Sequence, residues 1–342
     1  MSHPPANPIP EKPPIGLYGG EILFAAPRPW DETCFATPAL RAIRAARPSC
    51  TLGVICHEEQ ADYWSSIAGI NAIVAYDNRT KLRDMLRAHG ESPHSWDAAI
   101  LWEKDLAAEF CRSLGVKQRL GYALKPLTKF LTDAIPTDHT PSPVRHRVQY
   151  YLDLMEALKI PTRLAEIFSP SSMHHDRKAK HVVVSPDSDF GPSHEWTFTG
   201  WEKTIEWLGN KGFSEITLLG ASMEKNPLSS QLAQRFPSCR TERIANAAES
   251  LPLLASAGFA ICADSSICHL SAHVGTATLT LFGPNDPDWR RPLGKQHIVV
   301  REKVECSPCL MRKCLLDRRC QNELTAAKVI AAFEELWQRE AT

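Results

Sequence analysis

Short apolar runs alternate with amphipathic segments of helical period through the first half of the chain. Each apolar run is bounded by polar, glycine or proline residues, as buried strands are, and the segments between repeat their apolar positions every three to four residues. Such alternation predicts a parallel, doubly wound sheet with helices on both faces. The predicted strands are 21–27, 51–57, 72–77 and 98–102, and the predicted helices are 34–47, 79–89, 104–114 and 144–158.

The second half of the chain repeats this pattern. Its predicted strands are 181–186, 215–220, 259–264 and 277–283, and its predicted helices are 200–211, 227–235, 247–256 and 266–274. We therefore expect an α/β protein with two Rossmann-like domains whose parallel sheets face a central cleft. The predicted parts are a flexible proline-rich tail (1–17), an N-terminal domain (18–168), a linker (169–180), and a C-terminal domain (181–342) that ends in a helix.

Composition narrows the functional classes. The 342 residues contain 39 Lys and Arg and 39 Asp and Glu, so the charge balance does not favour a general nucleic-acid surface. No apolar stretch approaches the roughly 18 residues of a membrane span, and the first residues lack the layout of a signal peptide. We expect a cytoplasmic protein. No G-x-G-x-x-G motif follows a predicted strand, which disfavours a nicotinamide enzyme.

One stretch, "ADSSICHLSAHVGTATLTLFGPNDPDW" from Ala263 to Trp289, carries candidate chemistry. A buried strand, a short helix and a second strand form a βαβ unit, and ligands of open α/β sheets bind at the carboxyl ends of strands. Asp264, Ser265 and Ser266 would lie at that edge, beside the free N–H groups of the helix N-terminus. The stretch predicts a phosphate site, with Asp264 in a strand-end loop outside the core.

Three stretches together resemble glycosyltransferase family 9, the ADP-heptose:lipopolysaccharide heptosyltransferases. "FATPALRAIRAARPSCTLGVIC" resembles the family's first helix and second strand, and "SPDSDFGPSHEW" resembles its P-G-A-x-F-G-P-x-K-x-W loop. The 263–289 stretch resembles its D-T-G-x-x-H-L-A signature with the following L-F-G-P-T-D-P. The resemblance covers roughly residues 20 to 337 and implies the two-domain GT-B fold, with donor binding on the C-terminal domain.

The resemblance implies roles for individual residues. Asp264, Ser265, Ser266 and His269 occupy the signature positions that border the donor's diphosphate and sugar, and His194 stands where the family has a loop lysine. The family's catalytic aspartate precedes its Pro-Ala-Leu proline by six residues and follows a glycine. An ungapped count places Glu32 on that aspartate, whereas a gapped alignment makes Asp31 the base.

Four of the 11 cysteines crowd near the C-terminus in the spacing C-x2-C-x4-C-x5-C. Four thiolates at this spacing could enclose a structural zinc or iron, although the second spacer is shorter than in ordinary zinc ribbons. The alternative is a set of buried or redox-labile thiols. The four residues are Cys306, Cys309, Cys314 and Cys320.

These observations predict an inverting, metal-independent glycosyltransferase that moves a heptose from an ADP-sugar to a lipopolysaccharide-core or other glycan or lipid-linked acceptor. No cofactor is expected for catalysis and no nucleic-acid partner, while peripheral contact with the inner membrane face is possible. Two rivals stay open. One is a related protein that binds a donor without transfer, because the family's Gly-Asp and lysine are replaced at Asp31, Glu32 and His194. The other is a different α/β nucleotide-binding enzyme such as an epimerase or dehydrogenase.

Overall fold

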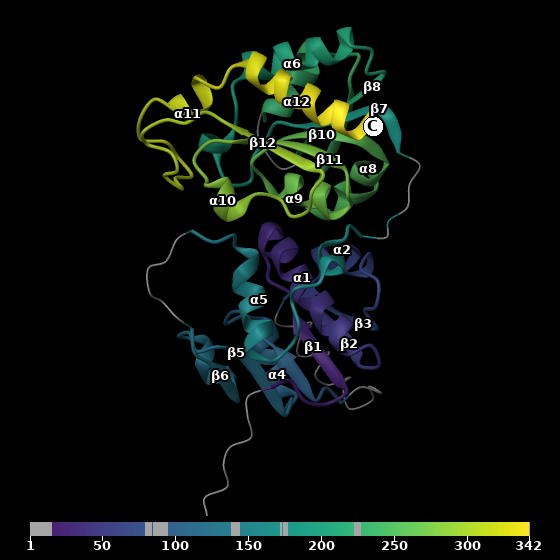
Figure 1. The fold of residues 1–342 in the computed structure, drawn as a ribbon, viewed down its shortest axis with the longest axis vertical. Helices are drawn as coiled ribbons and strands as arrows, with labels where there is room; N and C mark the ends of the chain where they lie inside the picture. The colour runs from purple at the N-terminus through teal and green to yellow at the C-terminus, as the bar shows by residue number, and fades with distance from the viewer. Residues whose placement is uncertain are drawn as a thin grey trace, which may run out of the picture.

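The computed structural model shows two α/β domains stacked along the long axis of the molecule (Figure 1). It describes residues 16–78, 84, 95–137, 144–171, 173, 177–221 and 227–341. The helix expected over 79–89 lies outside these residues, apart from a single position. Each domain has a central parallel sheet between layers of helices, so the predicted fold class is confirmed.

The N-terminal domain is built on a six-stranded parallel sheet in the order β3-β2-β1-β4-β5-β6. Its strands are β1 (Glu21–Ala25), β2 (Thr51–His57), β3 (Ala72–Tyr76), β4 (Ala98–Ile100), β5 (Gln118–Tyr122) and β6 (Asp133–Ile135). Its α-helices are α1 (Trp30–Ala46), α2 (Ala61–Ser65), α4 (Leu106–Ser113) and α5 (Val148–Ala157). The central strands β1 and β4 are almost wholly buried, as expected for a sheet covered on both faces.

The C-terminal domain repeats the same topology, with the order β12-β11-β10-β7-β8-β9. Its strands are β7 (Lys178–Ser185), β8 (Glu215–Ala221), β9 (Arg240–Ile244), β10 (Ala257–Ala263), β11 (Ala277–Phe282) and β12 (His297–Arg301). Its α-helices are α6 (Phe198–Asn210), α7 (Leu228–Arg235), α8 (Leu251–Ser256), α9 (Ser266–His273), α10 (Pro287–Arg290), α11 (Arg319–Asn322) and α12 (Ala326–Ala341). In both sheets the strand order reverses between the first and fourth strands of the domain, and open α/β sheets bind ligands at such a point.

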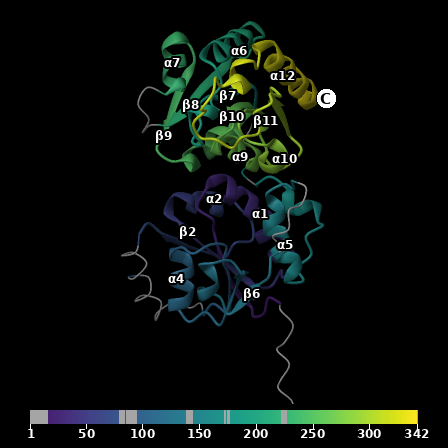
Figure 2. The same cartoon turned by 90° about the vertical axis from the view of Figure 1, so that its left-hand side faces the viewer.

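The two domains meet through α1 below and α9 above, which the perpendicular views of Figures 1 and 2 both show. The ring of Phe35 on α1 lies edge-on to that of His269 on α9, with 5.1 Å between ring centroids. Nearby, the Ser66 hydroxyl lies 3.1 Å from Nε2 of His273. The residues of the seam therefore include a signature residue of the C-terminal domain.

Several boundaries differ from the sequence predictions. Helix α1 begins at Trp30 and not at residue 34, directly after Pro29. The helix expected over 247–256 is a 3₁₀ turn (Ala247–Ser250) followed by α8, whose first turn holds Pro252; a proline suits a helix start because it has no N–H to donate. The last three residues of the expected linker, 178–180, belong to β7. Leu17, expected in the flexible tail, is buried in the N-terminal core.

Candidate functional site

A pocket of about 260 Å³ opens at the carboxyl ends of β7, β8 and β10, at the reversal point of the C-terminal sheet. Its polar lining comes from the β7 loop, including Asp187 and Asp189, and from the start of α9, where Ser265 and Ser266 lie. Trp30 and Glu59 of the N-terminal domain complete the wall, so the pocket faces the seam between the domains. Position and lining make it the candidate site for a nucleotide donor.

Gly220 on β8 shows how closely the floor of the pocket is packed. A Cβ atom at this position would come within 2.1 Å of the Ser229 hydroxyl and 3.0 Å of a carboxylate oxygen of Asp187. That carboxylate accepts hydrogen bonds from the backbone N–H and the hydroxyl of Ser229. Burial raises the pKa of Asp187, and these hydrogen bonds oppose the rise.

The N-terminus of α9, where the sequence predicts a phosphate, is held by a carboxylate of the chain itself. Oδ1 of Asp189 accepts a hydrogen bond of 2.9 Å from the backbone N–H of Ser266, and its other oxygen accepts one from the Ser266 hydroxyl. An anion is favoured here by the free N–H groups and by the helix dipole. Asp189 is thus an anionic occupant of the predicted phosphate position, and a donor diphosphate would compete with it.

Asp264 is fully buried beneath this pocket, so the prediction that it lies outside the core is wrong. Its Oδ2 lies 2.9 Å from Nδ1 of His194 and accepts a 2.7 Å hydrogen bond from the Asn285 amide. Burial raises the pKa of the Asp264 carboxyl, and His194 is the main opposing influence. Asp264 and His194 therefore form a buried support under the pocket, and only Ser265 and Ser266 of the five predicted donor residues line it.

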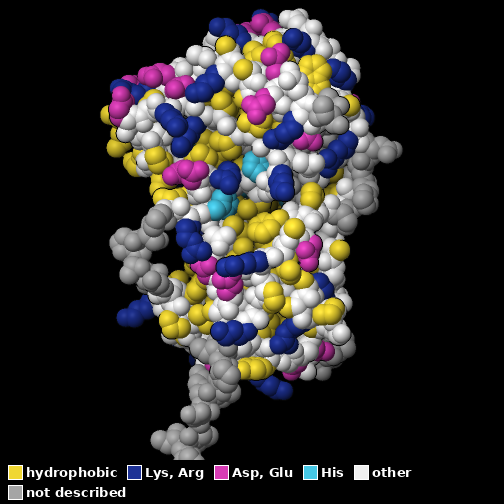
Figure 3. Space-filling model, viewed as in Figure 1, with side chains coloured by type: hydrophobic (Ala, Val, Ile, Leu, Met, Phe, Trp, Pro, Cys, Tyr) yellow, Lys and Arg dark blue, Asp and Glu magenta, His cyan; other side chains and the backbone are white. Residues whose placement is uncertain are grey.

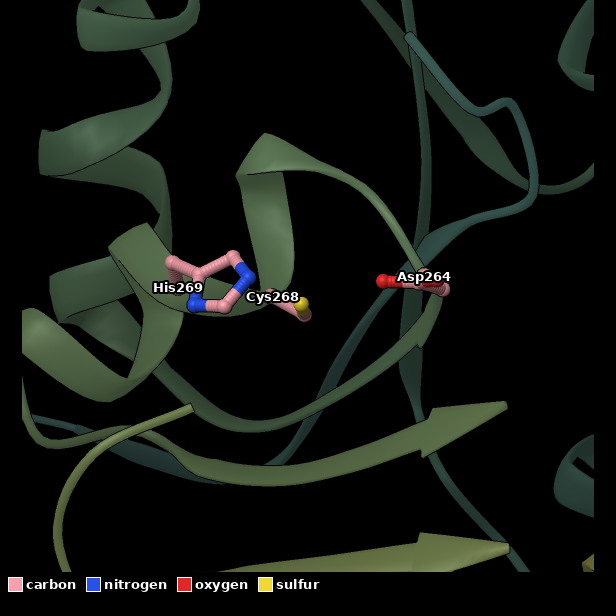
Figure 4. A group of neighbouring side chains, drawn as sticks. All are labelled: Asp264, Cys268 and His269. Carbon is pink, nitrogen blue, oxygen red and sulfur yellow. The ribbon is translucent and has the colours of Figure 1, made fainter. Parts of the chain in front are cut away.

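His269 and Cys268 stand on α9 beside Asp264 (Figure 4), with one potential ligand atom of each residue within 4.8 Å of the others. Among the described residues, no other set of three His, Cys, Asp or Glu side chains reaches this spacing. The hydrogen bonds, however, do not suit a metal. The Cys268 thiol donates to the Ser265 carbonyl at 3.0 Å, and metal ligation requires a thiolate.

Burial lowers the pKa of His269 well below its ordinary value, so its ring is neutral, and neither ring nitrogen has a hydrogen-bond partner. A buried, unpartnered imidazole is costly unless a ligand or water satisfies it. His269 lines a small cavity of about 30 Å³ at the seam, together with Cys34 and Arg41 of α1.

Both candidate bases lie in the first turn of α1. Oδ1 of Asp31 accepts a 2.9 Å hydrogen bond from the Glu32 N–H, and its other oxygen is paired with Arg290 of the C-terminal domain. Glu32 is held by Nε of Arg147 at 2.9 Å, by the Tyr151 hydroxyl at 2.6 Å, and by Arg290 at 3.2 Å. Asp31 is only 1% exposed, whereas the Glu32 side chain keeps 13%. Glu32 is the more accessible carboxylate.

Sequence reasoning missed Arg147, Tyr151 and Arg290. Arg147 and Tyr151 come from the start of α5, and Arg290 ends α10, more than 100 residues from Glu32 in the chain. The one signal for Arg290 was its place directly after the "GPNDPDW" stretch. Figure 3 shows the Lys, Arg and His side chains that gather along the seam.

A second pocket, of about 500 Å³, opens on the α5 side of the seam. Arg145, His146, Arg147 and Tyr150 line it from the N-terminal domain, and Trp289 lines it from the other side. The backbone N–H of Arg147 donates to the Trp289 carbonyl at 2.8 Å, which joins the domains at this wall. Arg147 contacts this pocket and Glu32 at once, so the pocket is the candidate acceptor side.

The four clustered cysteines come near one another without forming a compact set. Burial, followed by the neighbouring thiols of Cys306, Cys309 and Cys314, raises the pKa of Cys320 to about 11. No three of the four sulfur atoms lie within 4.8 Å of one another, although all four residues are described. A metal at this cluster stays a prediction.

Comparisons with known proteins identify the family of the chain. The family model of glycosyltransferase family 9 (heptosyltransferase) matches residues 92–319. Lipooligosaccharide heptosyltransferase 2 of Haemophilus influenzae is 26% identical over 126 residues, 35% of this chain and 36% of that protein. Lipopolysaccharide heptosyltransferase 1 of Pseudomonas aeruginosa is 25% identical over 139 residues, 41% of this chain and 39% of that protein. The matched region thus spans less than half the length of these relatives.

Among solved structures, the E. coli ADP-heptose LPS heptosyltransferase II superposes with a TM-score of 0.74 at 16% identity, over 94% of this chain and 100% of that one. The iron-containing dodecameric glycosyltransferase TibC of E. coli gives a TM-score of 0.58 at 15% identity, over 96% of this chain and 78% of that one. These likenesses show a shared fold. With the family model covering two thirds of the residues, the chain belongs to glycosyltransferase family 9.

Proposed function

We propose that this protein is an inverting heptosyltransferase that moves a heptose from an ADP-sugar to a lipopolysaccharide-core or related glycan acceptor. The observation that carries the proposal is the position of the α1 carboxylates. Glu32 is bonded to Arg290 across the domain seam; it stands two residues after Trp30, which lines the donor pocket, and is held by Arg147, which lines the second pocket.

The donor nucleotide would occupy the first pocket. Asn246 and Ala247 lie at the β9 end of its lining and suit contacts with a base, whereas the N-terminus of α9 suits the diphosphate. As the glycosidic bond to the diphosphate breaks, the N–H groups of Ser265 and Ser266 and the dipole of α9 stabilise the departing charge. Asp189 must leave the Ser266 N–H for this contact to form.

Glu32 would take the proton of the acceptor hydroxyl. The hydroxyl oxygen forms its bond to the anomeric carbon while the bond to the diphosphate breaks, so ADP leaves and the configuration inverts. Arg147 and Tyr151 fix the orientation of the Glu32 carboxylate, and Arg290 ties it to the donor domain. All of these groups belong to the chain, so the proposed reaction requires no metal.

The test is transfer from ADP-heptose to a lipopolysaccharide core that lacks heptose. We expect ADP release that depends on the acceptor, a mass gain of one heptose in the product, and an anomeric configuration opposite to that of the donor. Activity that survives dialysis against a chelator supports the metal-free reaction. Donor binding without transfer to any acceptor would favour the binding-only rival, and tight nicotinamide binding would favour a dehydrogenase.

We further propose that Cys306, Cys309, Cys314 and Cys320 hold a structural zinc or iron, which would require their sulfur atoms to come closer together than they are in the structure. The proximity of the other thiols to Cys320 supports this proposal. Protein purified under reducing, chelator-free conditions should contain about one metal equivalent, which Cys309→Ser and Cys314→Ser remove together with stability. Metal-free protein of full stability would contradict it.

We also propose that the protein works in the cytoplasm, at the inner face of the membrane where a lipid-linked acceptor is presented. None of the described helices combines the length and apolarity that crossing a bilayer requires.

A further inference from the structure

The loop that carries the four cysteines, residues 306–320 (the cysteine loop), exposes an unusual amount of apolar surface. Of the seven large hydrophobic side chains exposed among the described residues, four belong to seven consecutive positions of this loop. They form two pairs, Leu310 with Met311 and Leu315 with Leu316, and the second pair is 79% and 69% exposed. An exposed apolar cluster of this kind marks an interaction surface.

The backbone of the cysteine loop is fastened on both sides. The N–H groups of Cys309 and Leu310 donate to the Pro284 carbonyl at 3.0 and 2.9 Å. On the other side, the carbonyl of Arg312 accepts from the N–H of Ser193 at 3.4 Å. Leu310 adopts φ +60°, a left-handed conformation that a leucine keeps only where its surroundings enforce it. These bonds anchor the backbone that carries the first apolar pair, and the second pair is followed by Arg318, whose guanidinium donates to the Glu195 carbonyl.

The charges in the loop match an anionic partner. Arg312 and Lys313 stand between the two apolar pairs, and the one acidic residue of the loop, Asp317, is paired with Arg319. Leucines beside basic residues are typical of segments that lie in the headgroup region of a bilayer. A second copy of the chain is a poorer partner, because four side chains of one short loop fall well below the roughly 800 Å² per partner of a stable dimer.

The loop also lies at the acceptor side of the seam. Pro308 and Leu310 line the second pocket together with Arg145 and Arg147, and Arg147 in turn holds Glu32. In Figure 1 the loop projects from the C-terminal domain beside α11, and Figure 3 shows hydrophobic side chains at the corresponding edge of the molecule. A surface docked through this loop would thus lie next to the opening of the second pocket.

We propose that residues 310–316 dock on a bilayer containing anionic lipid, with Leu315 and Leu316 inserted among the headgroups and Lys313 facing the lipid phosphates, while the Arg312 guanidinium donates to the Asp189 carbonyl. The role of this contact depends on the proposed function, because it would bring a lipid-linked acceptor to the second pocket. Binding to lipid requires neither a donor nor transfer, so the two proposals can fail separately.

The experiment is flotation of the full chain, under reducing conditions, with vesicles of phosphatidylethanolamine and phosphatidylglycerol and with vesicles of phosphatidylcholine alone. We expect binding to the anionic vesicles that weakens with salt. The double variant Leu315→Ser/Leu316→Ser should lower the partition coefficient about tenfold or more, because two apolar side chains lose their insertion. Lys313→Gln should lower it about fivefold, the loss expected for one basic contact with the anionic surface.

Tyr18→Ser is the matched control, because Tyr18 is an exposed large side chain of the N-terminal domain, outside the loop. This variant should bind the vesicles as the wild type does. Equal flotation of the wild type and the leucine double variant would overturn the proposal, as would a wild type that binds neither vesicle. A wild-type dimer that the double variant abolishes, with no vesicle binding, would assign the surface to a second copy of the chain.

Discussion

Replacing Asp264 by alanine tests whether this carboxylate supports the donor pocket from below. The substitution removes one acceptor, Oδ2, that serves both Nδ1 of His194 and the Asn285 amide. His194 and Asn285 are 2% and 9% exposed, so water does not readily replace the lost acceptor. Both donors would be left without a partner inside the protein.

The cost follows from these contacts. Each buried donor without a partner costs about 1–3 kcal/mol, so Asp264→Ala should lower the free energy of unfolding by about 2–6 kcal/mol. Asp264→Asn keeps an acceptor at the Oδ2 position and should cost roughly 1–2 kcal/mol. Ser265→Ala is the matched control, because the Ser265 hydroxyl is buried with no hydrogen-bond partner and its removal should cost almost nothing.

The assay is urea unfolding followed by tryptophan fluorescence, with ADP binding measured by calorimetry on the same variants. We expect Ser265→Ala to be the most stable of the three variants, Asp264→Asn to be intermediate and Asp264→Ala to be the least stable. The affinity for ADP should fall in Asp264→Ala because the pocket loses its support. If the free energy of unfolding of Asp264→Ala lies within about 1 kcal/mol of the wild-type value, the supporting role of Asp264 is refuted.

Two further predictions concern pH and the α9 N-terminus. Burial lowers the pKa of His273 to about 3 and that of His297 to about 4, so the unfolded chain binds protons below about pH 6.5 that the folded chain does not. The free energy of unfolding should fall as pH drops from about 6.5 to 4, by up to about 1.4 kcal/mol per pH unit for each histidine, and His273→Gln should flatten the slope in a pH series of urea titrations. Asp189→Ala should free the Ser266 N–H and raise ADP affinity roughly fivefold by calorimetry. Weaker ADP binding in that variant would mean that Asp189 contacts the donor and does not compete with it.

The sequence predicted the two doubly wound domains because their central strands are strongly apolar. The sequence analysis missed four strands: β6, β9 and β12 at sheet edges, and β5, an interior strand whose sequence "QRLGY" begins with two polar residues. β9 is "RTERI", and three of its five residues are exposed, while β6 has three residues at the sheet edge. An edge strand is paired on one side only, so its sequence carries less of the apolar signal that marks a buried strand.

Only the part of the candidate site that a local sequence motif encodes could be predicted from the sequence. Ser265 and Ser266 follow a buried strand and open a helix, and the structure places both in the pocket lining. The burial of Asp264 depends on His194 and Asn285, which come from other loops. A local sequence pattern does not predict contacts between loops that are distant in the chain. The same holds for Arg290, whose pairing with Asp31 joins the two domains.

The measurement that tests the account most directly is kcat for heptose transfer by Glu32→Gln and Asp31→Asn, compared with the wild type. Glu32→Gln keeps the size of the side chain and removes its basic oxygen. We predict a loss of kcat of about 10²- to 10⁴-fold with nearly unchanged donor affinity. The loss of kcat in Asp31→Asn, which alters the buried partner of Arg290, should be much smaller. Full activity in Glu32→Gln together with abolished transfer in Asp31→Asn would contradict the assignment and make Asp31 the base.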